Sequence, residues 1–229
     1  AADGEREFSF YRNPGADMML GKEEVDKELI KRSRIFHYGS LSMTHDKNFE
    51  ATQYAIQVAK DNGCLISFDP NLRLSLWKTP EEARKRILYG MKQCDIMKIS
   101  EEEVAFVSEQ ENLEEGVSFI RDNSDIKILF VTLGNKGSIA YYKDEKIYCR
   151  GIHQEHVVDT TGAGDTFCGA VLSRILELGT DALTEEDIRE MLLFANAAAS
   201  IVVTRKGALC SMPELEEIRA ASSLIDKVL

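Results

Sequence analysis

The sequence lacks any long apolar run: none approaches the roughly 18 residues that a membrane-spanning helix needs. It is also short of basic residues, with 28 Lys and Arg against 39 Asp and Glu, which gives a formal net charge of −11. Nucleic acids and anionic membranes bind basic surfaces, so this charge argues against both as partners. The composition predicts a soluble protein in which any anion site is local.

Cysteine gives no sign of a disulfide framework or a zinc site. The residues are odd in number and none stand in Cys-x-x-Cys spacing: Cys64, Cys94, Cys149, Cys168 and Cys210. His153 and His156 follow Cys149, but no second cysteine pair completes a zinc set. The pattern predicts reduced thiols in a cytoplasmic protein.

Short apolar segments alternate with helical segments along most of the chain. Strands are expected at 35–38, 64–68, 96–99, 126–132 and 138–142. Helices are expected at 22–31, 46–62, 100–107, 163–178 and 184–203, from Thr79 and from Pro213. This alternation is typical of βαβ units with a mostly parallel sheet covered on both faces. We predict an α/β fold with three layers, α/β/α, in a single domain over residues 1–229.

The first residues follow a different pattern. In residues 5–12, polar or charged side chains alternate with Phe8 and Phe10, as in a strand with one apolar face, and a turn follows at residues 13–15. An exposed edge strand of this kind invites a partner strand. We therefore expect two copies of the chain to pair through it.

The stretch VDTTGAGDTF, which begins at Val158, carries the strongest chemical signal. A strand is expected to end at Val158 and a helix to begin at Ala163, so Gly162 and Gly164 fall at the turn between them. Free N–H groups and the positive helix end meet there, and glycine lets the backbone approach an anion closely. Asp165 could take a proton from a hydroxyl that attacks a bound phosphate. Spacing alone leaves open that Asp165 only offsets the helix dipole.

The same stretch resembles the C-terminal signature of the PfkB carbohydrate kinases, the ribokinase-like family. In that family the aspartate activates a sugar hydroxyl, and the preceding amides stabilise the transferred phosphoryl group. The resemblance implies a ribokinase-like fold with ATP as phosphate donor. It assigns catalytic roles to Asp165 and to the amides of Gly162, Ala163 and Gly164.

The stretch DPNLRLSLW, which begins at Asp69, lies after a predicted strand. An arginine there could grip a phosphate, whereas a turn held by its own Asp and Asn needs no ligand. Together with FHYGSLSM, which begins at Phe36, it resembles fructokinases within the PfkB family. The resemblance implies that Asn71 and Arg73 contact substrate or phosphate, and it favours fructose as the sugar.

Ser100-Glu101-Glu102-Glu103 supports two interpretations. Ser-x-x-Glu before an apolar run is a capping box, which accounts for both residues without a ligand. Many PfkB kinases instead carry Asn-x-x-Glu here, and fructokinases often carry the Lys-x-Ser-x-x-Glu of Lys98, Ser100 and Glu103. The resemblance implies that Glu103 helps to place Mg²⁺ through water, and Ser100 is interpreted first as a helix cap.

TLGNKG resembles the Thr-x-Gly-x-x-Gly nucleotide loop of the family, although alone it would indicate a hairpin turn. The resemblance assigns ATP contacts to Thr132, Gly134 and Gly137, and it implies that Asn196 faces the adenine. The stretch TRKGALCSMP resembles the segment that holds a monovalent cation in many relatives. Its oxygen donors, which suit a hard cation such as K⁺, would come from Asp159, Thr161 and Ser211.

PfkB kinases begin with a Gly-rich N-terminal portion, and the resemblance here starts after it. We therefore expect a ribokinase-like fold that is incomplete at the N-terminus, with residues 1–17 as a lid segment carrying a remnant β lid strand. The predicted activity is ATP-dependent phosphorylation of a sugar, fructose first. A ribokinase, a 2-keto-3-deoxygluconate kinase, or a truncated non-catalytic fragment that binds nucleotide remain alternatives.

Overall fold

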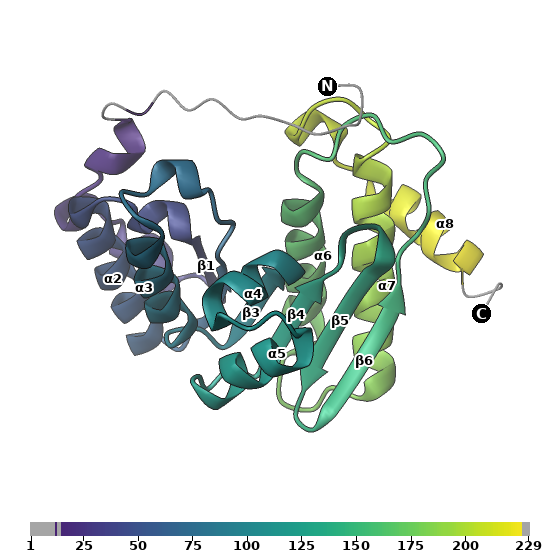
Figure 1. Cartoon of the computed structure of the whole chain (residues 1–229), viewed down its shortest axis with the longest axis horizontal. Coiled ribbons are helices and arrows are strands. Elements are labelled where there is room, and N and C mark those ends of the chain that lie inside the picture. The colour runs from purple at the N-terminus through teal and green to yellow at the C-terminus, as the bar shows by residue number, and fades with distance from the viewer. Residues whose placement is uncertain (1–11, 13–14, 226–229) are drawn as a thin grey trace. The chain divides into compact units, whose positions relative to one another are not determined.

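A computed structural model describes residues 12 and 15–225 of the chain (Figure 1). These residues form two compact units, one ending at Leu129 and the other beginning at Phe130, and each is described by itself. The predicted edge strand with Phe8 and Phe10, and the dimer contact expected through it, lie outside the described residues.

The first unit carries a parallel arrangement of strands. In it, β1 (Ile35–Gly39) pairs with β2 (Leu65–Asp69), which pairs in turn with β3 (Ile96–Ser100). The helices are α1 (Lys27–Lys31), α2 (Asp46–Asp61), α3 (Pro80–Met91), α4 (Glu101–Ser108) and α5 (Leu113–Asp122). Short 3₁₀ turns are η1 (Ala16–Met19), η2 (Lys22–Glu24), η3 (Ser40–Met43) and η4 (Leu74–Leu76). The parallel register brings the carboxyl ends of β1 and β2 together.

Local capping explains where these helices begin. Thr79 accepts a hydrogen bond from the Glu82 amide and Pro80 occupies the first turn of α3, where the sequence predicted a helix to begin. The helix predicted over 22–31 is wrong in extent, because η2 is only a short 3₁₀ turn. The Asp26 carboxylate caps the helix by accepting a hydrogen bond from the Leu29 amide, so α1 begins at Lys27.

The second unit carries an antiparallel hairpin. Strand order runs from β4 (Ile128–Thr132), which contains the boundary, through β5 (Gly137–Tyr142) to β6 (Glu145–Arg150). Strands β5 and β6 pair antiparallel, with Gly137 opposite Arg150. The remaining elements are η5 (Gly134–Lys136), α6 (Ala163–Leu178), α7 (Glu185–Val202), η6 (Leu209–Ser211) and α8 (Leu215–Ile225). Helix α7 packs against the hairpin and against α6 and α8 (Figure 1).

The strand expected to end at Val158 is absent, because residues 151–162 form no strand or helix. The side chains of Val157 and Val158 are 57% and 58% exposed. The amides of Val158 and Asp159 both donate to the Val203 carbonyl, over 2.8 and 3.2 Å. The segment is therefore tied to the end of α7 instead of to a sheet.

Across the described residues, no helix is long and apolar enough to cross a bilayer.

Candidate active site

Helix α6 begins with free backbone donors. Its N-cap Gly162 adopts a left-handed conformation with φ 82°, which glycine tolerates and other residues avoid. The Ala163 amide donates to the Thr160 carbonyl over 3.3 Å, whereas the amides of Gly162, Gly164 and Asp165 meet no acceptor among the described residues. Free N–H groups therefore gather at the positive end of a 16-residue helix, an arrangement that binds anions.

Asp165 lies beside these donors in the first turn of α6. Its side chain is exposed, and it has no hydrogen bond or ion pair within the part of the chain that the structure describes. The carboxylate is therefore available to a substrate beside the free amides. This is the geometry that the sequence predicted for a base next to an anion site.

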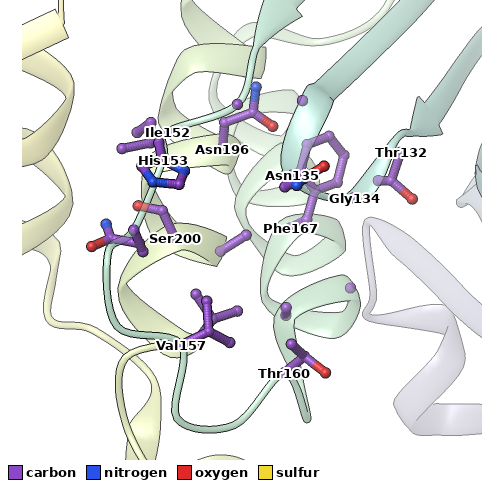
Figure 2. Close-up of a pocket in the computed structure, with 17 residues that line it drawn as sticks. Thr132, Gly134, Asn135, Ile152, His153, Val157, Thr160, Phe167, Asn196 and Ser200 are labelled. Atoms are coloured by element: carbon purple, nitrogen blue, oxygen red, sulfur yellow. The ribbon is translucent and has the colours of Figure 1, made fainter. Parts of the chain in front are cut away.

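A pocket of about 350 Å³ opens at the start of α6 (Figure 2). Its lining includes Ala163 and Gly164 together with the residues that the sequence assigned to ATP, namely Thr132, Gly134, Gly137 and Asn196. The structure therefore brings the predicted nucleotide loop and the predicted anion site to one cavity. Their contacts with ATP stay a prediction.

The nucleotide loop is fixed by the hairpin that follows it. Gly137 has φ 114°, and a Cβ there would lie 2.2 Å from the Cys149 carbonyl, so the position requires glycine. The Leu133 amide donates to the Gly137 carbonyl over 2.8 Å, and the Tyr148 hydroxyl donates to the Lys136 carbonyl over 2.7 Å. These contacts hold the loop at the rim of the pocket.

Asn196 is buried and bonded within the chain. Its Oδ1 accepts from the Ser138 hydroxyl over 3.0 Å, and its Nδ2 donates to the carbonyls of Cys149 and Arg150 over 3.2 and 3.4 Å. The side chain thus joins α7 to β5 and β6. Asn196 lines the pocket, but its side-chain amide is bonded to other residues of the chain. Its contact with adenine stays a prediction.

Sequence reasoning missed most of the pocket wall. The wall also contains Asn135, Gly151, Ile152, His153, Gln154, Val157, Thr160, Phe167, Ala199, Ser200 and Val203. A signal did exist on α7, because residues 199, 200 and 203 follow Asn196 at the spacing of one helix face. Residues 151–157 have no periodicity, so no comparable signal marked them. Burial raises the pKa of the nearby Cys149 thiol, which argues against its use as a thiolate ligand.

The residues assigned to a monovalent cation lie in two segments of the second unit, one before α6 and one after α7, which hydrogen bonds join. The Asp159 carboxylate accepts from the Thr161 amide over 2.8 Å and from the Gly207 amide over 3.2 Å. The Ser211 hydroxyl donates to the carbonyls of Gly207 and Ala208 over 2.7 and 2.6 Å. Side-chain and carbonyl oxygens therefore gather here, although no cluster of three or more His, Cys, Asp or Glu forms within the described residues.

In the first unit, the loop after β2 presents Asn71 and Arg73. The Asn71 amide donates to Asp69 Oδ1 over 3.1 Å, and Asn71 itself has φ 44°. The Leu72 amide donates to Glu103 Oε1 over 2.7 Å. The half-buried Arg73 donates to the Leu72 carbonyl over 2.9 Å. Two carboxylates therefore hold successive amides of the loop that carries the arginine.

Glu103 is first of all a helix-capping residue. Its amide donates to Ser100 Oγ over 3.2 Å and its Oε2 accepts from the Ser100 amide over 2.9 Å, which confirms the predicted capping box. Nearby, Lys98 Nζ lies 3.0 Å from Asp69 Oδ2, with both side chains buried. The sequence did not reveal this ion pair. A magnesium role for Glu103 stays a prediction.

A comparison with known proteins identifies the family of this chain. Residues 1–215 match the model of the pfkB family carbohydrate kinases. The chain belongs to this family. An Arabidopsis thaliana protein named "Probable fructokinase-2" is 43% identical over 212 residues, which cover 93% of this chain and 64% of that protein. This pfkB chain therefore spans about two thirds of the length of that curated relative.

Solved structures of pfkB relatives share the fold. A fructokinase of Xylella fastidiosa with bound ATP has a TM-score of 0.88 and 29% identity, over 99% of this chain and 72% of that one. A fructokinase of Vibrio cholerae O395, with fructose, ADP and calcium, has a TM-score of 0.84 and 30% identity, over 95% and 69%. The predicted ribokinase-like α/β fold is confirmed, with a mixed set of parallel and antiparallel strands.

Proposed function

We propose that this chain belongs to an ATP-dependent sugar kinase of the cytoplasm that phosphorylates fructose to fructose 6-phosphate. The observation that carries the proposal is the free Asp165 carboxylate beside free amides at the start of α6, at a pocket lined by the nucleotide loop. The fructokinase relative at 43% identity supports fructose as the sugar. The structure at 30% identity with fructose and ADP supports it further.

The proposed reaction is in-line transfer of the γ-phosphoryl group. Asp165 accepts the proton of the sugar hydroxyl as the hydroxyl oxygen attacks phosphorus, and the bond from phosphorus to the ADP oxygen breaks. The free amides of Gly162 and Gly164 bind the oxygens of the transferred group. A contact of Arg73 with substrate or phosphate stays a prediction of the family resemblance. A general base of this kind raises the rate by about 10²- to 10⁴-fold.

The donor sets fit the two metal ions that the family resemblance implies. Mg²⁺ keeps several waters and takes few carboxylates, so Glu103, whose oxygens retain free lone pairs, fits a water-mediated contact. Bound Mg²⁺ would neutralise phosphate charge. The oxygens of Asp159, Thr161 and Ser211 fit a monovalent cation such as K⁺.

The test is product formation from ATP, Mg²⁺ and a panel of sugars, with Asp165→Asn and the exposed Glu145→Gln as a matched control. We expect turnover with fructose, a loss of about 10²- to 10⁴-fold in Asp165→Asn with ATP binding retained, and an unchanged rate in Glu145→Gln. Unchanged turnover in Asp165→Asn would rule out the mechanism. Faster turnover of ribose or 2-keto-3-deoxygluconate would reassign the sugar.

A non-catalytic role is the second candidate. A pocket lined by the nucleotide loop accounts for ATP binding without requiring phosphoryl transfer. Binding of ATP by this chain, without consumption in the presence of any sugar of the panel, would support it.

A further inference from the structure

The buried polar side chains of the pocket are already bonded to the protein. Within its described lining, the buried polar residues are Asn196 and Ser200. The Asn196 amide bonds Ser138 and two carbonyls of β6, and the Ser200 hydroxyl donates to the Ala197 carbonyl over 2.8 Å. Neither side chain has a donor left to recognise the edge of a base.

The wall around these groups is apolar. Figure 2 shows Ile152, Val157 and Phe167 around one cavity, and Ala199 and Val203 complete this wall. Val157 is 57% exposed, so a planar base that entered the pocket would cover apolar surface that water now meets. Such contacts depend on the size and flatness of the base and hardly on its hydrogen-bonding edge.

The remaining polar side chains of the lining are all at least partly exposed to solvent. Asn135, His153 and Thr160 are exposed, and Thr132 and Gln154 are half-buried. A hydrogen bond made there replaces one to water, and it changes an equilibrium constant by only about two- to tenfold. The rim therefore adds little to the discrimination between bases.

We propose that this pocket accepts GTP and ITP as phosphate donors alongside ATP; the inference rests on the proposed kinase function. Apolar contacts distinguish ligands by about 10- to 200-fold, whereas a site built from buried hydrogen bonds rejects the wrong ligand by about 10⁴- to 10⁵-fold. The wall of this pocket is of the apolar kind, so we expect weak discrimination between bases. The transferred group, the leaving bond and the acceptor hydroxyl are the same for each donor.

The test is kcat/KM for ATP, GTP and ITP with fructose and Mg²⁺, paired with calorimetric affinities for ADP, GDP and IDP. We expect GTP and ITP to lie within about 200-fold of ATP, and the diphosphates to differ by no more. A wider gap in either measurement would overturn the inference, and it would indicate that main-chain groups of residues 151–154 read the base. Product from ATP alone would leave the proposed function standing, whereas binding of all diphosphates without product from any donor would remove the kinase function only.

Two variants separate the wall from the rim. Val157→Ala should weaken ADP and GDP by the same factor, up to about tenfold, because it removes apolar surface that every base covers. Gln154→Ala should change the ratio of the two affinities by less than about tenfold. A larger change in that ratio in Gln154→Ala would overturn the inference, and so would a Val157→Ala effect confined to one base.

Discussion

The two units build their candidate site residues from different parts of the polypeptide. In the second unit, free amides at the start of α6 and glycines of the nucleotide loop supply the site, so its chemistry is largely that of the main chain. In the first unit, the loop carrying Arg73 is held by Asp69 and Glu103, and Asp69 is paired with the buried Lys98. One site depends on backbone conformation and the other on buried charge.

This difference predicts different failures. A main-chain site fails when a residue forces φ and ψ away from the required values, which costs about 1 to 3 kcal/mol and can leave the rest of the unit folded. A loop held by buried charges fails when one partner is removed, because the other is left unpaired in the interior. Variants in the second unit should affect activity first, and variants in the first unit should affect stability first.

The largest effect on stability is expected from Lys98→Met, which removes a charge at nearly constant length. The change leaves the Asp69 carboxylate, with a side chain 4% exposed, without its cation, so the free energy of unfolding should fall by about 3 to 5 kcal/mol. Urea denaturation measures it. The exposed Lys85→Met on α3 should stay within about 0.5 kcal/mol. A loss below about 1 kcal/mol in Lys98→Met would break the comparison, since the first unit would then not depend on buried charge.

Gly162→Ala tests the main-chain site. A Cβ at Gly162 would meet its nearest atoms at 3.6 and 3.7 Å, so the strain comes from φ +82° alone. We expect a loss of about 1 to 2 kcal/mol in stability and a clear fall in kcat. Gly169→Ala, within the same helix and with nothing near its Cβ, should instead stabilise by about 0.5 to 1 kcal/mol. Unchanged kcat in Gly162→Ala would show that the turn geometry does not matter.

The smallest effect is expected from Ser100→Ala, which removes the cap of α4. Stability should fall by about 1 kcal/mol, because the Glu103 amide loses its acceptor. The Glu103 carboxylate keeps its bond to the Leu72 amide, so we expect kcat to stay close to that of the unmodified chain. Thermal denaturation and steady-state kinetics measure the two, with exposed Ser75→Ala as the control. A fall in kcat without a fall in stability would place Ser100 in the chemistry.

The features that could be predicted from sequence are the local ones. The helix start at Thr79, the Ser100 capping box and the turn at Gly162 each depend on a few adjacent residues, and the structure has all three. The anion site predicted for the GAGD stretch depends on local sequence in the same way, and it stays a prediction. Short-range stereochemistry is enough to specify such features.

The features that could not be predicted depend on distant residues. The Lys98–Asp69 pair needs the register of β2 and β3, and the pocket wall needs α7 packed against the hairpin. Strand β6 was missed because its alternation of buried and exposed residues is short. The strand expected at Val158 was wrong because the Val203 carbonyl takes the amides that a neighbouring strand would need.

That carbonyl has a further consequence for motion. Val203 at the end of α7 accepts from Val158 and Asp159, and the Asp159 carboxylate accepts from the Gly207 amide. These hydrogen bonds join the segment before α6 to the segment after α7. We therefore expect the amides of both segments to exchange with deuterium at similar rates. A local opening far smaller than global unfolding would release both at once, and the turn at Gly162 would lose its geometry while the strands stayed intact.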